Sequence, residues 1–194
     1  MFLLIAIAVG VIVGFLSGGS LANVVNVRFR ALPLLLVALF VQVLIFTPIL
    51  GTLAIIHDIG PYIYIATMLA TVTAMVLNFH VPGMPIVALG AALNTLAIIA
   101  NGGFMPSPED ALREAGRLEL VRQDEADRAN GDYMLSNSKI ADDGTNLQLL
   151  GDVLVIPDGW PLSNVFSIGD VIIGIGGAIV IVRAMHAREV KGEE

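Results

Sequence analysis

The chain has 194 residues, of which 56% are hydrophobic and only 14% charged, and its mean hydropathy is +0.85. A soluble domain usually carries about 25% charged residues, so this composition argues against a water-soluble globule and favours an integral membrane protein. Cysteine is absent, which excludes disulfides, thiolate catalysis and cysteine-ligated metals, and the net charge of −7 argues against nucleic acid as a partner.

Five apolar stretches approach the roughly 20 residues that a helix needs to cross a bilayer core. None of them has a lysine or arginine before its last residues. They cover residues 1–17, 31–50, 61–78, 85–101 and 165–184. We therefore expect an all-α membrane protein with five transmembrane helices, built as a single domain over residues 1–194. One insertion, residues 102–164, separates the fourth helix from the fifth.

The order of charges along the chain sets the expected orientation. A cleaved signal peptide carries positive residues before its apolar segment, whereas here Arg28 and Arg30 follow the first stretch, which favours a retained helix. Short loops rich in lysine and arginine stay in the cytoplasm. With five spans, these two arginines fall on the same side as Arg183, Arg188 and Lys191. The N-terminus is then outside and the C-terminus is cytoplasmic.

Small and polar residues inside the spans are candidates for helix packing. Gly10, Gly14 and Gly18 recur every four residues, so they share one helix face that lets another helix approach, within this chain or in a partner. Gln42 and Asn94 lie near the middle of the second and fourth spans, where amides need hydrogen-bond partners. We expect these two amides to face each other as packing contacts, and the alternative is a site for a small neutral ligand.

The insertion holds the acidity of the chain. It carries twelve acidic and five basic residues, while the rest of the chain carries five of each. Ser107 and Asp110 fit a capping box at the start of a helix. Because the apolar residues that follow make only a weak stripe, we expect a solvated surface helix that runs to about Arg128. An acidic, solvated insertion belongs on the outer face.

Asp170 is the only acidic residue within a predicted span. A carboxylate inside a membrane is by default a candidate functional group. However, Ser167 precedes it by three residues, which also fits a capping box in the first turn of the fifth helix. The capping interpretation is preferred, and the functional one stays open.

Three short motifs lie near the outer ends of the fourth and fifth spans. They are Asn-Gly-Gly-x-Met-Pro at 101–106, Thr-x-Leu-x-x-x-Gly-Asp at 145–152 and Ser-x-Gly-Asp at 167–170. With these motifs the sequence resembles a family of small bacterial integral membrane proteins that carries a domain of unknown function. The resemblance implies the bacterial plasma membrane and a single-domain architecture, and it implies no known activity. It directs attention to Asn101, Asp152 and Asp170 as a possible outward-facing polar pocket that binds a ligand.

No motif in the sequence supports an enzyme, a cofactor or a metal site. The three histidines, His57, His80 and His186, belong to separate loops or helix ends. We expect a non-catalytic accessory, assembly or scaffold protein whose partners are the lipid bilayer and other membrane protein subunits. The alternative is a small-molecule binding protein or transporter that uses the outer pocket.

Overall fold

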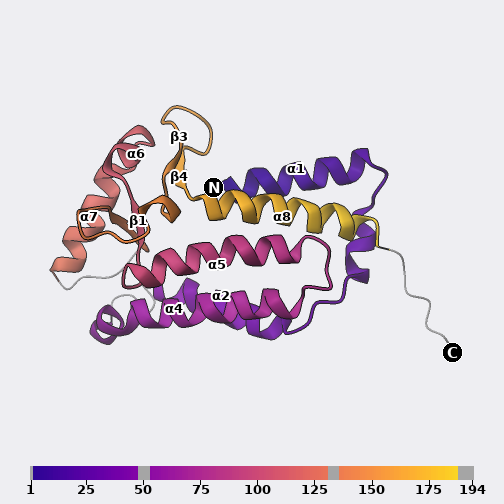
Figure 1. Cartoon of the computed structure of the whole chain (residues 1–194), viewed down its shortest axis with the longest axis horizontal. Coiled ribbons are helices and arrows are strands. Elements are labelled where there is room, and N and C mark those ends of the chain that lie inside the picture. Colours follow the sequence, from indigo (N-terminus) through magenta and orange to yellow (C-terminus); the bar gives the residue numbers. More distant parts are fainter. Residues whose placement is uncertain (1, 48–52, 131–135, 188–194) are drawn as a thin grey trace.

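A computed structural model describes residues 2–47, 53–130 and 136–187, and this part of the chain is mostly helical. Five apolar helices lie side by side with their long axes roughly parallel (Figure 1). They are α1 (Phe2–Leu16), α2 (Leu32–Ile45), α4 (Ala54–Leu77), α5 (Met84–Ala100) and α8 (Ile168–Met185). Their packing order is α1, α8, α5, α4, α2, so α8 lies between the first helix and α5.

Two of these helices are long and apolar enough to cross a membrane. They are Asp58–Leu77 within α4, and α8. The other three, α1, α2 and α5, are apolar but shorter. The helix predicted from residue 61 begins at Ala54, so Pro61 lies inside α4 rather than in its first turn. A proline there removes a single backbone hydrogen bond, and the helix continues through it.

The insertion contains short strands as well as helices, which an all-α chain would not have. Strand β1 (Met105–Ser107) pairs in parallel with β2 (Ser138–Ile140), and β3 (Leu154–Ile156) pairs antiparallel with β4 (Asn164–Phe166). A 3-10 turn, η2 (Gln148–Leu150), precedes β3.

The predicted surface helix of the insertion is wrong in two respects. It is broken into α6 (Glu109–Glu114) and α7 (Leu118–Ala129) at Gly116, which has a φ of +66°. Ser107 lies in β1 and does not cap α6. The apolar residues of α6 and α7 pack against β3 and β4 and form a second hydrophobic core. The buried residues of this core are Ala111, Leu112, Ala115, Leu118 and Val121 from the two helices and the turn between them, and Val165 from β4. The periodicity of residues 109–128 could not reveal this burial, because β3 and β4, which cover the helices, lie far along the chain.

Glycine pairs set the closest helix contact, between α5 and α8. A Cβ added to Gly83 would lie 2.7 Å from the Gly176 carbonyl oxygen, and one added to Gly90 would lie 2.5 Å from the Gly169 carbonyl oxygen. Gly83, directly before α5, and Gly90 within it are seven residues apart, as are Gly169 and Gly176 of α8, and the two pairs meet in antiparallel register. Without side chains between them, the two backbones come into direct contact.

The glycines predicted in the first helix pack partly as expected. Gly10 and Gly14 are buried and face Ala178 and Met185 of α8. Gly18 does not belong to this face, because α1 ends at Leu16 and a Cβ on Gly18 would meet nothing within 4 Å. The glycine face is thus used within the chain.

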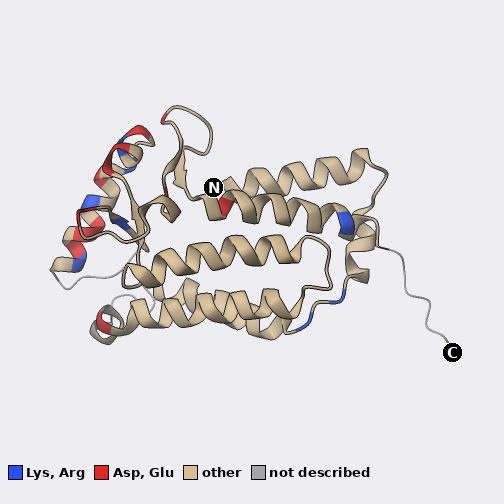
Figure 2. Cartoon of the chain, in the orientation of Figure 1, with Lys and Arg blue, Asp and Glu red and all other residues tan. Residues whose placement is uncertain are grey.

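Charged residues gather at the two ends of the helix row (Figure 2). At one end, here called the insertion end, α1 begins, α5 ends and the acidic insertion packs against the start of α8. At the other, the arginine end, the 3-10 helix η1 (Leu21–Asn26) joins α1 to α2, and Arg28, Arg30 and Arg183 lie here. Among the described residues, α1, α2 and α5 carry no charge at all.

Candidate functional site

The candidate site begins with the first turn of α8, at the insertion end. The Ser167 hydroxyl accepts a hydrogen bond from the Asp170 backbone N–H at 2.9 Å, and the Asp170 carboxylate accepts one from the Ser167 N–H at 3.1 Å. This is the capping box that the sequence predicts. The capping interpretation of Asp170 is therefore confirmed, and one oxygen of the carboxylate is turned back toward its own helix.

Asn94 of α5 joins both members of the capping box. Its side-chain NH2 donates to Asp170 Oδ1 at 2.9 Å, and its oxygen accepts from the Ser167 hydroxyl at 2.8 Å. A Cβ on Gly169 would lie in the space that the Asn94 side chain occupies. The glycine contact between α5 and α8 thus creates the room in which Asn94, Ser167 and Asp170 form a closed hydrogen-bonded ring.

Asp152 reaches the same region from the insertion. Its backbone N–H donates to the carbonyl oxygen of Pro106, the middle residue of β1, at 2.9 Å. Gly151 makes this approach possible, because a Cβ there would lie 2.3 Å from the same oxygen. The Gly-Asp pair of the second motif therefore fixes where the Asp152 carboxyl points.

The two carboxyl groups line one cavity of about 370 Å³ between α4, α5, α8 and the insertion strands. Asn94 and Tyr64 also line it, and the Tyr64 hydroxyl accepts a hydrogen bond from the Asn137 side chain at 3.0 Å. The remaining lining residues are Met68, Ile98, Met105, Ser138, Asn164, Val165 and Ile173. Seven of the twelve lining residues are polar, so hydrogen-bonding and charged groups dominate this cavity.

The cavity perturbs the titration of Asp152. Burial, and after it the negative charge of Asp170, raise the pKa of Asp152 to about 7. The Ser107 oxygen, which lies nearby, is fully buried and makes no hydrogen bond within the described part of the chain. Near neutral pH the cavity therefore holds a carboxyl group close to its titration midpoint.

The structure brings together two of the three predicted pocket residues. Asp152 and Asp170 share the cavity, whereas Asn101 does not line it. The Asn101 side chain donates to the Ala97 and Asn146 carbonyl oxygens and accepts from the Asn146 N–H at 2.9 Å. Its role in the described structure is to hold the loop before η2 against the end of α5.

The two mid-span amides do not face each other as predicted. Gln42 of α2 donates to the Thr67 hydroxyl of α4 at 3.1 Å and lies 3.7 Å from the Met68 sulfur. Asn94 instead faces α8. Gln42 thus joins α2 to α4, and Asn94 joins α5 to α8. In the packing order of the helices, α4 and α5 lie between α2 and α8. The positions of the spans in the sequence do not reveal this order.

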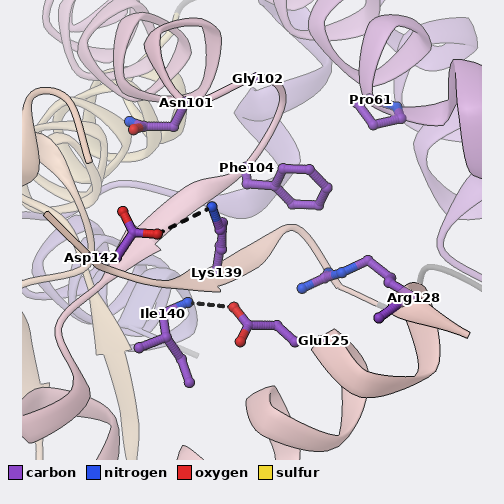
Figure 3. Close-up of a pocket in the computed structure, with 10 residues that line it drawn as sticks. Pro61, Asn101, Gly102, Phe104, Glu125, Arg128, Lys139, Ile140 and Asp142 are labelled. Atoms are coloured by element: carbon purple, nitrogen blue, oxygen red, sulfur yellow. Dashed lines mark hydrogen bonds and ion pairs between the residues drawn. The ribbon is translucent and has the colours of Figure 1, made fainter. Parts of the chain in front are cut away.

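A larger cavity of about 780 Å³ lies beside Asn101 and Phe104 (Figure 3). Its charged groups are already partnered within the chain. Lys139 lies 3.6 Å from Asp142, and Glu125 accepts from the Ile140 N–H at 2.8 Å. Arg128, on its wall, pairs with Asp124 at 2.8 Å and covers the Phe104 ring at 4.8 Å. This cavity therefore offers a ligand less free charge than the smaller one does.

Sequence reasoning missed four polar residues that line the site, namely Tyr64, Asn137, Ser138 and Asn164. Tyr64 carries a signal that could have been used, since it is a hydroxyl-bearing side chain in the outer half of an apolar span. Asn137 lies more than 70 residues after Tyr64, and nothing in its local sequence places it near α4. Groups of three or more metal-ligating side chains are absent from the described residues.

A protein family model matches the part of the sequence that contains the cavity. The model of DUF5317, a family of unknown function, matches residues 26–182, a range that contains every residue lining the cavity. No curated protein and no solved structure matches the chain. Since the match covers well over half of the sequence, the chain belongs to the DUF5317 family.

Proposed function

We propose that the chain is a five-span protein of the bacterial plasma membrane whose outer end binds a small organic cation. The observation that carries this proposal is the cavity beside Asp152 and Asp170. Two carboxyl groups line it, and no lysine, arginine or histidine of the described residues does. A cationic ligand would supply a counter-charge that the lining side chains do not.

The bundle itself supports the membrane location. Besides the two helices of spanning length, α5 has 17 residues and so extends about 25 Å along its axis, close to the thickness of a bilayer core. Large apolar side chains are exposed along α1 and α2, including Phe15 and Phe40. Lipid is the solvent that tolerates such surfaces, so the bilayer is the first partner of this protein.

The distribution of charge supports the proposed orientation. The arginine end carries the positive residues that stay in the cytoplasm, and the acidic insertion lies at the opposite end (Figure 2). The start of α1 belongs to the insertion end, because the Phe2 ring stacks on Phe166 of β4 at 4.6 Å. This arrangement favours an N-terminus outside and a C-terminus in the cytoplasm.

The chemistry of the cavity favours an organic amine as the ligand. A volume of about 370 Å³ suits a small molecule and is far larger than a bare metal ion requires. Carboxylates can accept hydrogen bonds from an ammonium group, and the Tyr64 ring adds an aromatic surface of the kind that attracts cations. Carboxamide groups of Asn137 and Asn164 supply uncharged contacts.

An accessory or scaffold role is less well supported than the sequence indicated. That expectation was motivated by the compact span count, the soluble outer insertion and glycine faces available to partner subunits. In the structure, Gly10 and Gly14 face α8 of the same chain, as do the glycines of α5. Partner subunits would therefore have to bind surfaces other than these.

The test is calorimetric titration of the purified full chain in detergent with tetramethylammonium and ethanolamine. We expect binding to strengthen as the pH rises through about 7, because Asp152 becomes a carboxylate above its raised pKa. Asp152→Asn should weaken the binding of ethanolamine above pH 7 by about tenfold, since a charge-assisted hydrogen bond is worth about 1.5 kcal/mol or more. The variant should also lose the pH dependence.

Asp142→Asn is the matched control. Asp142 lies in the same insertion but is exposed, and it pairs with Lys139 outside the cavity. The Asp142→Asn variant should bind tetramethylammonium and ethanolamine as the unchanged protein does. If this control lost affinity equally, the effect would be general electrostatic attraction. If the folded, unchanged protein bound neither cation above pH 7, the proposal of a cationic ligand would be wrong.

A further inference from the structure

The arginine end contains a second chemically distinct cavity, of about 410 Å³. It lies between the segment after η1, the turn from α4 to α5, and the last turn of α8. Arg28, His80, Arg183 and His186 line it together with apolar residues. Four basic side chains from three separate segments thus converge on one hollow at the end of the bundle.

The positive charge of this cavity has no counter-charge among the described residues. No acidic residue lines it, and neither Arg28 nor Arg183 forms an ion pair in that part of the chain. The described acidic residues lie in the insertion or at the starts of α4 and α8, which is the opposite end of the bundle (Figure 2). The cavity therefore attracts an anion.

His186 lies where a positive charge is favoured. Its Nδ1 lies 2.8 Å from the Val182 carbonyl oxygen and its Nε2 lies 3.0 Å from the Ser17 carbonyl oxygen. Because a carbonyl oxygen only accepts hydrogen bonds, this geometry favours the imidazolium form, in which both ring nitrogens are donors. These contacts raise the pKa of His186, the Val182 carbonyl more than the Ser17 carbonyl, even though Arg183 lies close by.

The surroundings of the cavity are apolar. Val27, Val81 and Pro82 are part of its lining, and Val25, Phe29 and Phe79 near it expose much of their surface. An anion that binds here would therefore meet cations in the hollow and apolar side chains around it. A molecule with an anionic head and an apolar tail satisfies both surfaces at once.

We propose that this cavity binds the phosphate group of an anionic phospholipid from the cytoplasmic leaflet, with Arg28 and Arg183 as its main contacts. Basic pockets between helices on the cytoplasmic side commonly hold anionic headgroups. Arginine suits the task, since its planar guanidinium donates two parallel hydrogen bonds to phosphate oxygens. The proposal depends on the membrane location of the bundle but not on the amine cavity at the insertion end.

The experiment is native mass spectrometry of the full chain in detergent, titrated with phosphatidylglycerol or with phosphatidylcholine of the same acyl chains. Phosphatidylglycerol should be retained preferentially. A basic residue near an anionic lipid contributes roughly fivefold to binding, so Arg28→Gln with Arg183→Gln should weaken phosphatidylglycerol binding roughly 25-fold. Binding of phosphatidylcholine should not change.

Arg30→Gln is the matched control, since Arg30 lies in the same segment but does not line the cavity. It should change binding by less than about twofold, well below the effect of one contacting arginine. Arg28→Lys with Arg183→Lys keeps both charges but not the paired hydrogen bonds of the guanidinium, so it should restore part of the binding, which separates lost charge from lost folding. Circular dichroism should show equal helicity in all variants.

Three results would overturn the proposal. The first is equal retention of the two lipids, and the second is a loss in Arg30→Gln as large as in the double variant. The third is displacement of phosphatidylglycerol by inorganic phosphate but not by chloride of equal ionic strength, which would identify free phosphate as the ligand. Asp152→Asn should leave lipid binding intact, so failure here is distinguishable from failure of the amine site.

Discussion

Ser167 caps α8 and also donates a hydrogen bond to Asn94, so its replacement should destabilise the protein more than the loss of a helix cap alone. Ser167→Ala removes the acceptor for the Asp170 N–H and the donor to the Asn94 oxygen. A lost N-cap costs about 1 kcal/mol, and a buried acceptor without a donor costs about 1 kcal/mol more. We expect the free energy of unfolding in detergent to fall by about 2 kcal/mol.

Asp170→Asn should cost less than Ser167→Ala. The amide keeps one acceptor oxygen but presents its NH2 to one of two donors, so a single hydrogen bond is lost, worth about 1 kcal/mol. Ser17→Ala is the control, because that exposed hydroxyl bonds only to carbonyl oxygens of its own helix. A silent Ser167→Ala beside a large loss from Asp170→Asn would contradict the capping account.

At Asp170 the two interpretations left open by the sequence turn out to be compatible. The Ser-x-x-Asp spacing predicts the cap, and its geometry holds. The same carboxyl group lines the cavity with Asp152. The spacing could not reveal Asn94 as the third member, because that contact depends on two helices separated by the whole insertion.

Adjacent glycines of α8 should respond in opposite ways to the same substitution. A Cβ on Gly176 would lie 2.7 Å from the Val87 backbone nitrogen, whereas one on Gly177 would meet nothing within 4 Å. Gly176→Ala should destabilise the protein by roughly 1–3 kcal/mol through overpacking. Gly177→Ala should stabilise it by up to about 1 kcal/mol, since alanine is the better helix former.

Thermal unfolding of both variants in the same detergent measures this difference. Because the two residues are neighbours, membrane depth and expression context are nearly matched between them. Equal transition temperatures would mean that α5 and α8 separate easily and that the glycine pairs are not a tight contact. In that case the position of Asn94 over Gly169 would also lose its explanation.

At the scale of elements, the sequence predicts the positions of the apolar helices better than it predicts how the helices pack or how the insertion folds. Long runs of apolar residues located all five, although α4 begins seven residues earlier than expected. The glycines seven residues apart in α5 and α8 were visible in the sequence, but a spacing of four directed attention to α1. The insertion was predicted poorly, because Leu112 and Val121 are buried by Val165, more than 40 residues away.

For the molecule as a whole, charge and shape favour the same arrangement. An acidic, folded insertion with a cavity of about 370 Å³ lies at one end, and a basic cavity of about 410 Å³ lies at the other. Between them the described helices carry few charges, and their outer surfaces are apolar. A bilayer would cover those surfaces and leave each cavity near its own aqueous face.

The absence of native cysteine makes this orientation directly testable. We expect cysteine at Asp143, which is exposed in the insertion, to react in intact cells with a thiol reagent that cannot cross the membrane. Cysteine at Ala22, exposed in η1 at the arginine end, should react only after the cells are permeabilised. Neither substitution alters an arginine, so the charge bias that sets the topology is preserved. Reaction of Ala22→Cys in intact cells, with Asp143→Cys protected, would mean an inverted protein, and both proposed ligands would then face the wrong compartments. Reaction of both would place the two ends on one side and rule out a row of spanning helices.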